Sequence, residues 1–169
     1  KIAGAPTNGQ TIATVGATLV SALVDFASPA GQVDNVGDVD TGAVLGIAIT
    51  ATNSTNGVWW FTTNNGTAWT QVGAVNATDG RLLLANATTA VFFQPTGGFV
   101  GTVSDGFTFH AWDGTSGANG SLTANNVAVT GGATAFSTAT DTAAVDVVAV
   151  PVTSFTLVNL NGGDINADG

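Results

Sequence analysis

The sequence of 169 residues has a formal net charge of −9, no cysteine and only two basic residues, Lys1 and Arg81. Its length suits one domain with a core of its own, and no apolar run reaches the roughly 20 residues of a membrane helix. The lack of cysteine excludes disulfides and thiolate zinc sites, and the acidic balance argues against nucleic acid or an anionic membrane as a partner. Charged residues make up 8% of the chain, against about 25% in an average soluble domain, so we expect a nearly neutral surface.

Short runs of β-branched and aromatic residues, separated by glycine and asparagine, predict an all-β fold. In chain order we expect strands at 11–15, 45–49, 58–63, 68–72, 81–85, 89–94, 105–112, 122–130, 142–150 and 154–160. The segment 17–27 is ambiguous, because its leucines have helical spacing while its β-branched residues favour a strand. Closely spaced turn signals without intervening helices favour an antiparallel β-sandwich over a parallel sheet.

One β-hairpin is specified in detail by the stretch "NGVWWFTTNNGTAWTQVG". Its arms are 58–63 and 68–72, and Asn64-Asn65-Gly66 supplies residues that tolerate positive φ in the turn. The strand aromatics that we expect in the core are Trp59, Trp69, Phe93, Phe107 and Phe109.

Four stretches carry a family signature when they are taken together: "DVDTGAVLGIAIT", "TNGVWWFTTNNGTAWTQVGAV", "VFFQPTGGFVGTVSDGFTFHAWDGTSG" and "GGATAFSTATDTAAVDVVAV". They resemble the cadherin-like, Ig-like repeat modules of very large bacterial surface adhesins. The resemblance implies a Greek-key sandwich over 34–150, an adhesive or structural role, and calcium at the junctions between modules. It leaves 1–33 as an N-terminal strand segment that could exchange with a neighbour, and 151–169 as a C-terminal strand with an acidic tail.

This chain differs from the family pattern on the solvent side of its strands. Where such modules tend to carry charged residues it has Trp60, Ala90 and Phe92, and His110 stands where arginine is usual. Because side chains alternate across a strand, Trp60 and Phe92 should point away from the core. Exposed aromatic clusters mark partner surfaces, so we assign Trp60, Phe92 and His110 to such a surface.

The acidic residues suggest calcium. Asp34, Asp38 and Asp40 fall within seven residues in a loop rich in glycine and asparagine, and Asp113 could join them from another loop. The alternative is that these aspartates only cap and solvate turns. Near the end of the sequence, Asp164, Asn166 and Asp168 have the spacing that opens an EF-hand loop. The bidentate glutamate that completes such a loop is not present, which favours an acidic linker there.

The residue inventory argues against an enzyme. His110 is the only histidine, glutamate is absent, and no G-x-S-x-G pattern is found. Five Asn-x-Ser/Thr sequons begin at asparagines that would be acceptors in a glycosylating host, namely Asn53, Asn65, Asn76, Asn86 and Asn119.

We therefore expect a non-enzymatic β-sandwich that is secreted or displayed on a bacterial cell surface. It would serve in cell adhesion or in a self-assembling filament, with calcium as its cofactor. Its partners would be copies of itself or adjacent modules, joined by strand addition. The alternative is a carbohydrate- or ligand-binding module of an adhesin, in which the aromatic surface stacks on cell-surface glycans.

Overall fold

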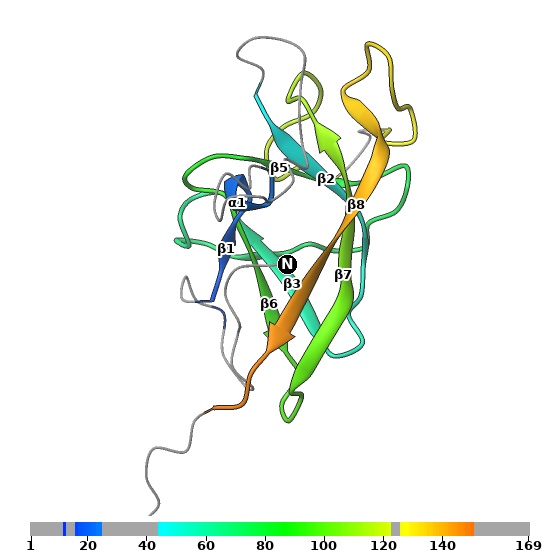
Figure 1. The fold of residues 1–169 in the computed structure, drawn as a ribbon. Helices are drawn as coiled ribbons and strands as arrows, with labels where there is room; N and C mark the ends of the chain where they lie inside the picture. Colours follow the sequence, from blue (N-terminus) through cyan, green and yellow to red (C-terminus); the bar gives the residue numbers. More distant parts are fainter. Residues whose placement is uncertain (1–11, 13–15, 25–43, 123–125, 151–169) are drawn as a thin grey trace, which may run out of the picture.

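The computed structural model describes residues 12, 16–24, 44–122 and 126–150. Within them, two antiparallel four-stranded sheets face each other, with strand orders β1-β6-β3-β4 and β5-β2-β7-β8 (Figure 1). The prediction of an all-β sandwich is confirmed at this level. The elements are β1 (Thr18–Leu19), α1 (Ser21–Val24), β2 (Gly46–Thr52), β3 (Gly57–Thr62), β4 (Thr70–Gln71), β5 (Arg81–Leu84), β6 (Ala90–Pro95), β7 (Gly101–Trp112) and β8 (Phe136–Val147).

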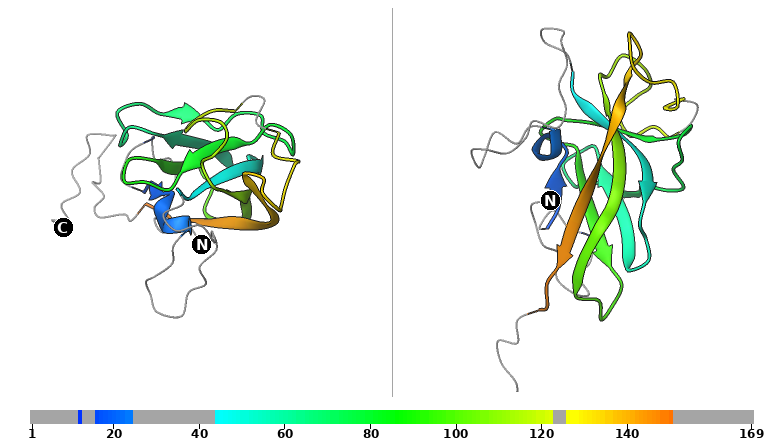
Figure 2. Two further views of the ribbon diagram at one scale, coloured as in Figure 1. Left: turned by 90° about the horizontal axis from the view of Figure 1, so that it is seen from above. Right: turned by 45° about the vertical axis from the view of Figure 1, so that its right-hand side comes forward.

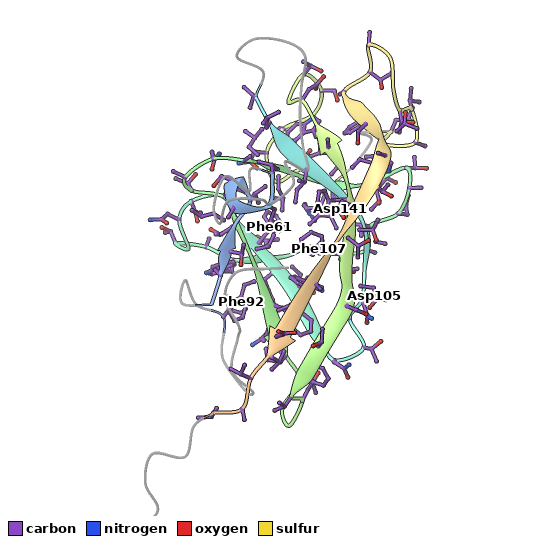
Figure 3. The ribbon with its side chains drawn as sticks, in the orientation of Figure 1. Phe61, Phe92, Asp105, Phe107 and Asp141 are labelled. Carbon is purple, nitrogen blue, oxygen red and sulfur yellow. The ribbon has the colours of Figure 1, made fainter. Side chains whose placement is uncertain are left out.

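The main core fills the space between the sheets, which appear as two layers when the molecule is seen from above (Figure 2). Alternation along the strands builds it, because every second side chain faces the opposite sheet. Trp59 on β3 contacts Phe93 on β6 and Phe107 on β7, with ring centroids 4.8 and 4.9 Å apart respectively. Figure 3 labels Phe61 and Phe107, which both belong to this core.

The ambiguous segment near the N-terminus is part of the sandwich. Thr18–Leu19 pairs antiparallel with β6 of the same chain, and a four-residue helix, Ser21–Val24, follows at once. Val20, Leu23 and Val24 are buried in the main core. The sandwich therefore begins earlier in the chain than the expected boundary at residue 34.

Most strand predictions agree with the structure, and the hairpin turn has the expected conformation. Asn65 and Gly66 have φ angles of 56° and 80°. The strand expected at 122–130 is wrong, because the described residues of this stretch form turns and loop. Val127 packs there against Trp112 and Phe136, in a second apolar cluster on the outer side of the β5-β2-β7-β8 sheet. The strands expected at 11–15 and 154–160 lie outside the described residues, apart from Ile12.

Candidate functional site

The outer side of the β1-β6-β3-β4 sheet carries the aromatic residues that the sequence singled out. Trp60 pairs with Phe92 on one side and with Gln71 on the other, while the flanking Trp59 and Phe93 belong to the core. Alternation therefore places Trp60, Phe92 and Gln71 together on the outer side. We call this surface the tryptophan face and define it by its exposed and half-exposed side chains, namely Leu19, Val58, Trp60, Trp69, Gln71 and Gln94.

Phe92 is buried, so its predicted place on an exposed partner surface is wrong. Its exposed fraction is 1%, and that of its neighbour Ala90 is 8%. The indole of Trp69 packs against the Phe92 ring with centroids 6.0 Å apart, which takes Phe92 out of water. Trp69, expected in the core, is half-buried and lies on the outer side instead.

Trp69 is carried by a hairpin loop with its own hydrogen bonds. The side-chain oxygen of Asn64 accepts hydrogen bonds from the Ala68 amide at 2.9 Å and from the Thr62 hydroxyl at 2.9 Å. The Asn65 amide donates to the Thr88 carbonyl at 2.9 Å, which ties the loop to the turn before β6. The backbone leading to Trp69 is thus fixed by local bonds.

Trp60 is also held in one orientation. Its indole Nε1 donates to the side-chain oxygen of Gln94 at 3.1 Å, across the β3–β6 pair. Beyond Trp60 on the other side, Gln71 is exposed, and its side-chain amide makes no hydrogen bond within the described part of the chain. Considering the described residues alone, the face therefore offers an oriented indole beside an amide that is available for hydrogen bonds.

A shallow hollow adjoins the tryptophan face at the β4 edge of the sheet. Its volume is about 190 Å³, and it shares Val58 and Gln71 with the face. Thr52, at the end of β2, and Ser54, in the segment that follows, also line it, so two residues with hydroxyl groups share the hollow with Gln71. The hollow is smaller than the roughly 300–1,000 Å³ of a typical small-molecule pocket, so it would hold one group of a larger ligand.

His110 does not belong to the tryptophan face, because it lies on β7 of the other sheet. It pairs with Ala48 on β2 and with Thr140 on β8, and its side chain is half-buried. Its Nδ1 lies 2.7 Å from the Ser137 carbonyl oxygen. A carbonyl only accepts hydrogen bonds, so this contact places a ring proton on Nδ1. His110 thus fastens the start of β8 to β7.

The second candidate surface is the open edge of β8. This strand has 12 residues and, among the described residues, pairs with β7 alone (Figures 1 and 2). Thr138, Ala139, Thr140, Asp141 and Thr142 are all exposed along it. On an edge strand, alternate backbone N–H and C=O groups point away from the sheet and can pair with a further strand.

Arg81 is a structural residue whose importance the sequence analysis did not predict. It is 9% exposed, and burial lowers the pKa of its guanidinium. Its Nε and Nη2 donate to the Val72 carbonyl at 3.0 and 2.8 Å, and its Nη1 donates to the Gly120 carbonyl. The guanidinium also lies 4.7 Å from the centroid of the Phe61 ring. Arg81 thus joins β5 to the opposite sheet. The sequence feature that could have predicted this role is that Arg81 is the one basic residue within the expected strands.

The predicted calcium ligands lie largely outside the described residues. This holds for two groups, namely Asp34, Asp38 and Asp40, and Asp164, Asn166 and Asp168. Asp113 is described, and its Oδ1 accepts bonds from the Thr115 amide at 2.8 Å and hydroxyl at 2.6 Å, as in an ordinary aspartate turn. The described ranges hold no group of three or more acidic, histidine or cysteine side chains placed to share a metal ion.

The five sequons occupy two different settings. Asn53, Asn65, Asn76 and Asn86 lie in or beside turns, and the side-chain oxygens of Asn53, Asn76 and Asn86 accept bonds from the residue two positions on. Asn119 is different, because its side-chain oxygen accepts from the Leu84 amide at 3.0 Å and its amide donates to the Thr89 hydroxyl at 3.0 Å. A glycan on Asn119 would replace one of those amide hydrogens in a half-buried site.

Comparison of the chain with family models, with curated proteins and with solved structures gave no match. In the part of the chain that the structure describes, no helix has the length and apolar character needed to cross a membrane.

Proposed function

We propose that this protein is a non-enzymatic structural module of an extracellular assembly, and that copies of it associate through the edge of β8. The observation that carries the proposal is the length of this edge. Among the described strands, β8 has 12 residues and a single partner strand. Edge strands that are long and weakly charged pair readily with strands of other chains.

Among the described strands, the other three sheet edges offer less backbone for pairing than β8 does. β1 and β4 have two residues each. The edge of β5 is covered by the loop 119–121, since the Leu82 amide donates to the Ser121 carbonyl at 3.0 Å and the Gly120 amide donates to the Leu82 carbonyl at 2.7 Å. β8 is therefore the edge best suited to pairing with a strand of another chain.

The side chains of β8 are compatible with pairing between two copies. Asp141 and Asp146 are its only charged residues, and the Asp146 carboxylate accepts a hydrogen bond from Thr102 at 2.6 Å. In an antiparallel arrangement that sets Thr142 opposite its own copy, Asp141 faces Ala143 and Asp146 faces Thr138. No two carboxylates are then directly opposed, and opposed like charges are what destabilises such pairs.

The finer parts of this function rest on the family resemblance of 34–150. They are a cadherin-like Greek-key topology, a location on a bacterial cell surface, a role in adhesion or in a filament, and stiffening by calcium. A chain whose charged fraction is only 8% is compatible with a module that buries part of its surface against neighbours.

Light scattering tests the association directly. We expect the mean mass to rise above 16.6 kDa with concentration, and to rise further with salt, which screens repulsion between molecules of charge −9. Replacing Thr140 and Thr142 with lysine should keep the mass near the monomer value of 16.6 kDa, because charged lysines on an edge strand oppose pairing with another chain.

The matched control carries lysine at Ser104, on the interior strand β7, and at Ala77, in a loop. Both positions are exposed, and two added positive charges change −9 to −7 in both variants. The control should associate as the parent chain does. Equal association of the edge variant and the control would reject β8 as the contact.

A further inference from the structure

The tryptophan face combines two features that the proposed assembly does not use. Trp60 and Trp69 are both half-exposed, and they lie on the sheet opposite to the one that contains β8. We propose that this face binds an uncharged saccharide chain, with Trp60 as the principal stacking surface. Aromatic rings bind the apolar C–H faces of sugars while neighbouring polar groups hydrogen-bond the hydroxyls.

The indoles are ordered before any ligand arrives. The Trp60 ring is hydrogen-bonded to Gln94 at 3.1 Å, and the Trp69 ring packs against Phe92, so each indole has a contact that favours its orientation. A rigid aromatic surface loses little conformational entropy on binding. The buried Phe92 thus supports the face from beneath, although it cannot contact a ligand itself.

Polar groups suited to sugar hydroxyls stand next to Trp60. Gln71 is its cross-strand neighbour, and the amide of Gln71 can both donate and accept hydrogen bonds. The adjoining hollow of about 190 Å³ adds the hydroxyls of Ser54 and Thr52. One sugar unit can enter this hollow while the next lies along Trp60.

The lack of ionisable side chains on the tryptophan face favours an uncharged saccharide over a charged one. None of the residues that define the tryptophan face is ionisable, and the chain carries a net charge of −9. Arg81, the only basic residue in the described ranges, is buried and bonded to two carbonyl oxygens. Among the described residues, the face therefore has no cation to bind a carboxylate or a sulfate, which disfavours uronate, sialic acid and sulfated glycans.

Native affinity electrophoresis tests the proposal with defined probes. Gels would contain one of three soluble neutral polysaccharides, namely dextran, galactomannan or hydroxyethylcellulose, and polygalacturonate would serve as the anionic comparison. We expect retardation by at least one neutral polysaccharide and none by polygalacturonate. Trp60→Ala and Gln71→Ala should each weaken retardation by about tenfold, since the loss of one ring contact or hydrogen bond to a ligand is of that order.

Controls separate this site from folding and from assembly. Val129→Ala removes an exposed side chain from a loop outside the face and should bind as the parent chain does. The variant with lysine at Thr140 and Thr142 should also keep its retardation relative to a polysaccharide-free gel, which distinguishes sugar binding from association through β8. Thermal melts would establish that Trp60→Ala and Gln71→Ala remain folded.

Two outcomes would overturn the inference. One is no retardation in any of the three neutral gels. The other is retardation that Trp60→Ala and Gln71→Ala leave unchanged while both variants remain folded.

Discussion

The indole of Trp69 packs edge-on against the ring of Phe92, with centroids 6.0 Å apart and ring planes inclined by 64°. This contact explains how a phenylalanine on the outer side of a two-layer sandwich reaches an exposed fraction of 1%. If the register of the hairpin is continued beyond Thr70, Trp69 lies opposite Thr62, which in turn pairs with Ala90. Both of these side chains are small, so the indole can lie over them. The sandwich thus has a small apolar layer outside its main core.

Replacement of Trp69 tests this outer layer. We expect Trp69→Ala to lower the free energy of unfolding by about 2–3 kcal/mol, because it removes a large side chain and exposes Phe92. Trp69→Phe should cost less than about 1.5 kcal/mol, since a smaller ring still covers Phe92. Urea denaturation measures both. Equal, near-zero losses in the two variants would contradict a covering role for Trp69.

Arg81 should be a stability residue with little tolerance for replacement. Arg81→Met should lower the free energy of unfolding by about 2–4 kcal/mol, because the Val72 and Gly120 carbonyls lose their donors. Arg81→Lys should recover only part of that loss, because an ammonium group cannot reproduce the fork of bonds or the stacking on Phe61. Urea denaturation of the three proteins gives the comparison, and full stability in Arg81→Met would refute the assignment.

The lowered pKa of Arg81 fixes the sign of its pH effect. A base whose pKa is lower in the folded state than in the unfolded state holds its proton less tightly when folded, so its charged form costs stability at every pH below both values. That cost is relieved only as the pH rises into the strongly alkaline range. Between about pH 5 and pH 9, Arg81 should therefore add no pH dependence to stability, because the guanidinium stays protonated in both states.

Asn119 should matter for folding although it forms part of a sequon. Asn119→Ala should lower the free energy of unfolding by about 1–3 kcal/mol, because the Leu84 amide and the Thr89 hydroxyl each lose a half-buried partner. Asn76→Ala is the matched control in an exposed turn and should cost less than about 1 kcal/mol. The denaturation midpoints report the difference. An equal effect at the two sites would show that the Asn119 bonds add nothing.

Calcium remains a prediction from the sequence, and a thermal melt can test it. If Asp34, Asp38 and Asp40 bind the ion, excess calcium should raise the melting temperature of chelator-treated protein, as any ligand of the folded state does. The triple Asp→Asn variant at these positions should lose that rise. Asp113→Asn should keep it, because the Asp113 carboxylate bonds within its own turn. A melting temperature unaffected by calcium in the parent chain would remove calcium from the account.

The sequence predicted the local features of the fold well. Alternation identified β2, β3, β5 and β6 within a few residues, and the Asn65–Gly66 turn followed from the φ angles these residues tolerate. It failed at 122–130, where Val127 and its neighbours suggested a strand. Val127 is buried, but it lies in a loop and packs against Trp112 on the outer side of the sheet. A pattern of apolar residues indicates that a residue is buried, but it does not show whether that residue lies in a strand or in a loop.

The site was predicted less completely, because surfaces depend on contacts between distant residues. Alternation placed Trp60 and Phe92 correctly on the outer side, but it could not show that Trp69 covers Phe92. Gln94 and Gln71 carried no signal of their own, since their roles come from the pairing of β3 with β6 and β4. His110 was grouped with Trp60 although the two lie on different sheets.

Amide hydrogen exchange along β8, measured at low and high protein concentration, tests the central claim most directly. Association through this edge predicts that alternate amides between Thr140 and Val147 gain protection as concentration rises, because each outward N–H gains a carbonyl partner from the second copy. Amides of the interior strand β2 should show no such change. Exchange along β8 that is independent of concentration, while the mean mass rises, would contradict the account and place the contact elsewhere.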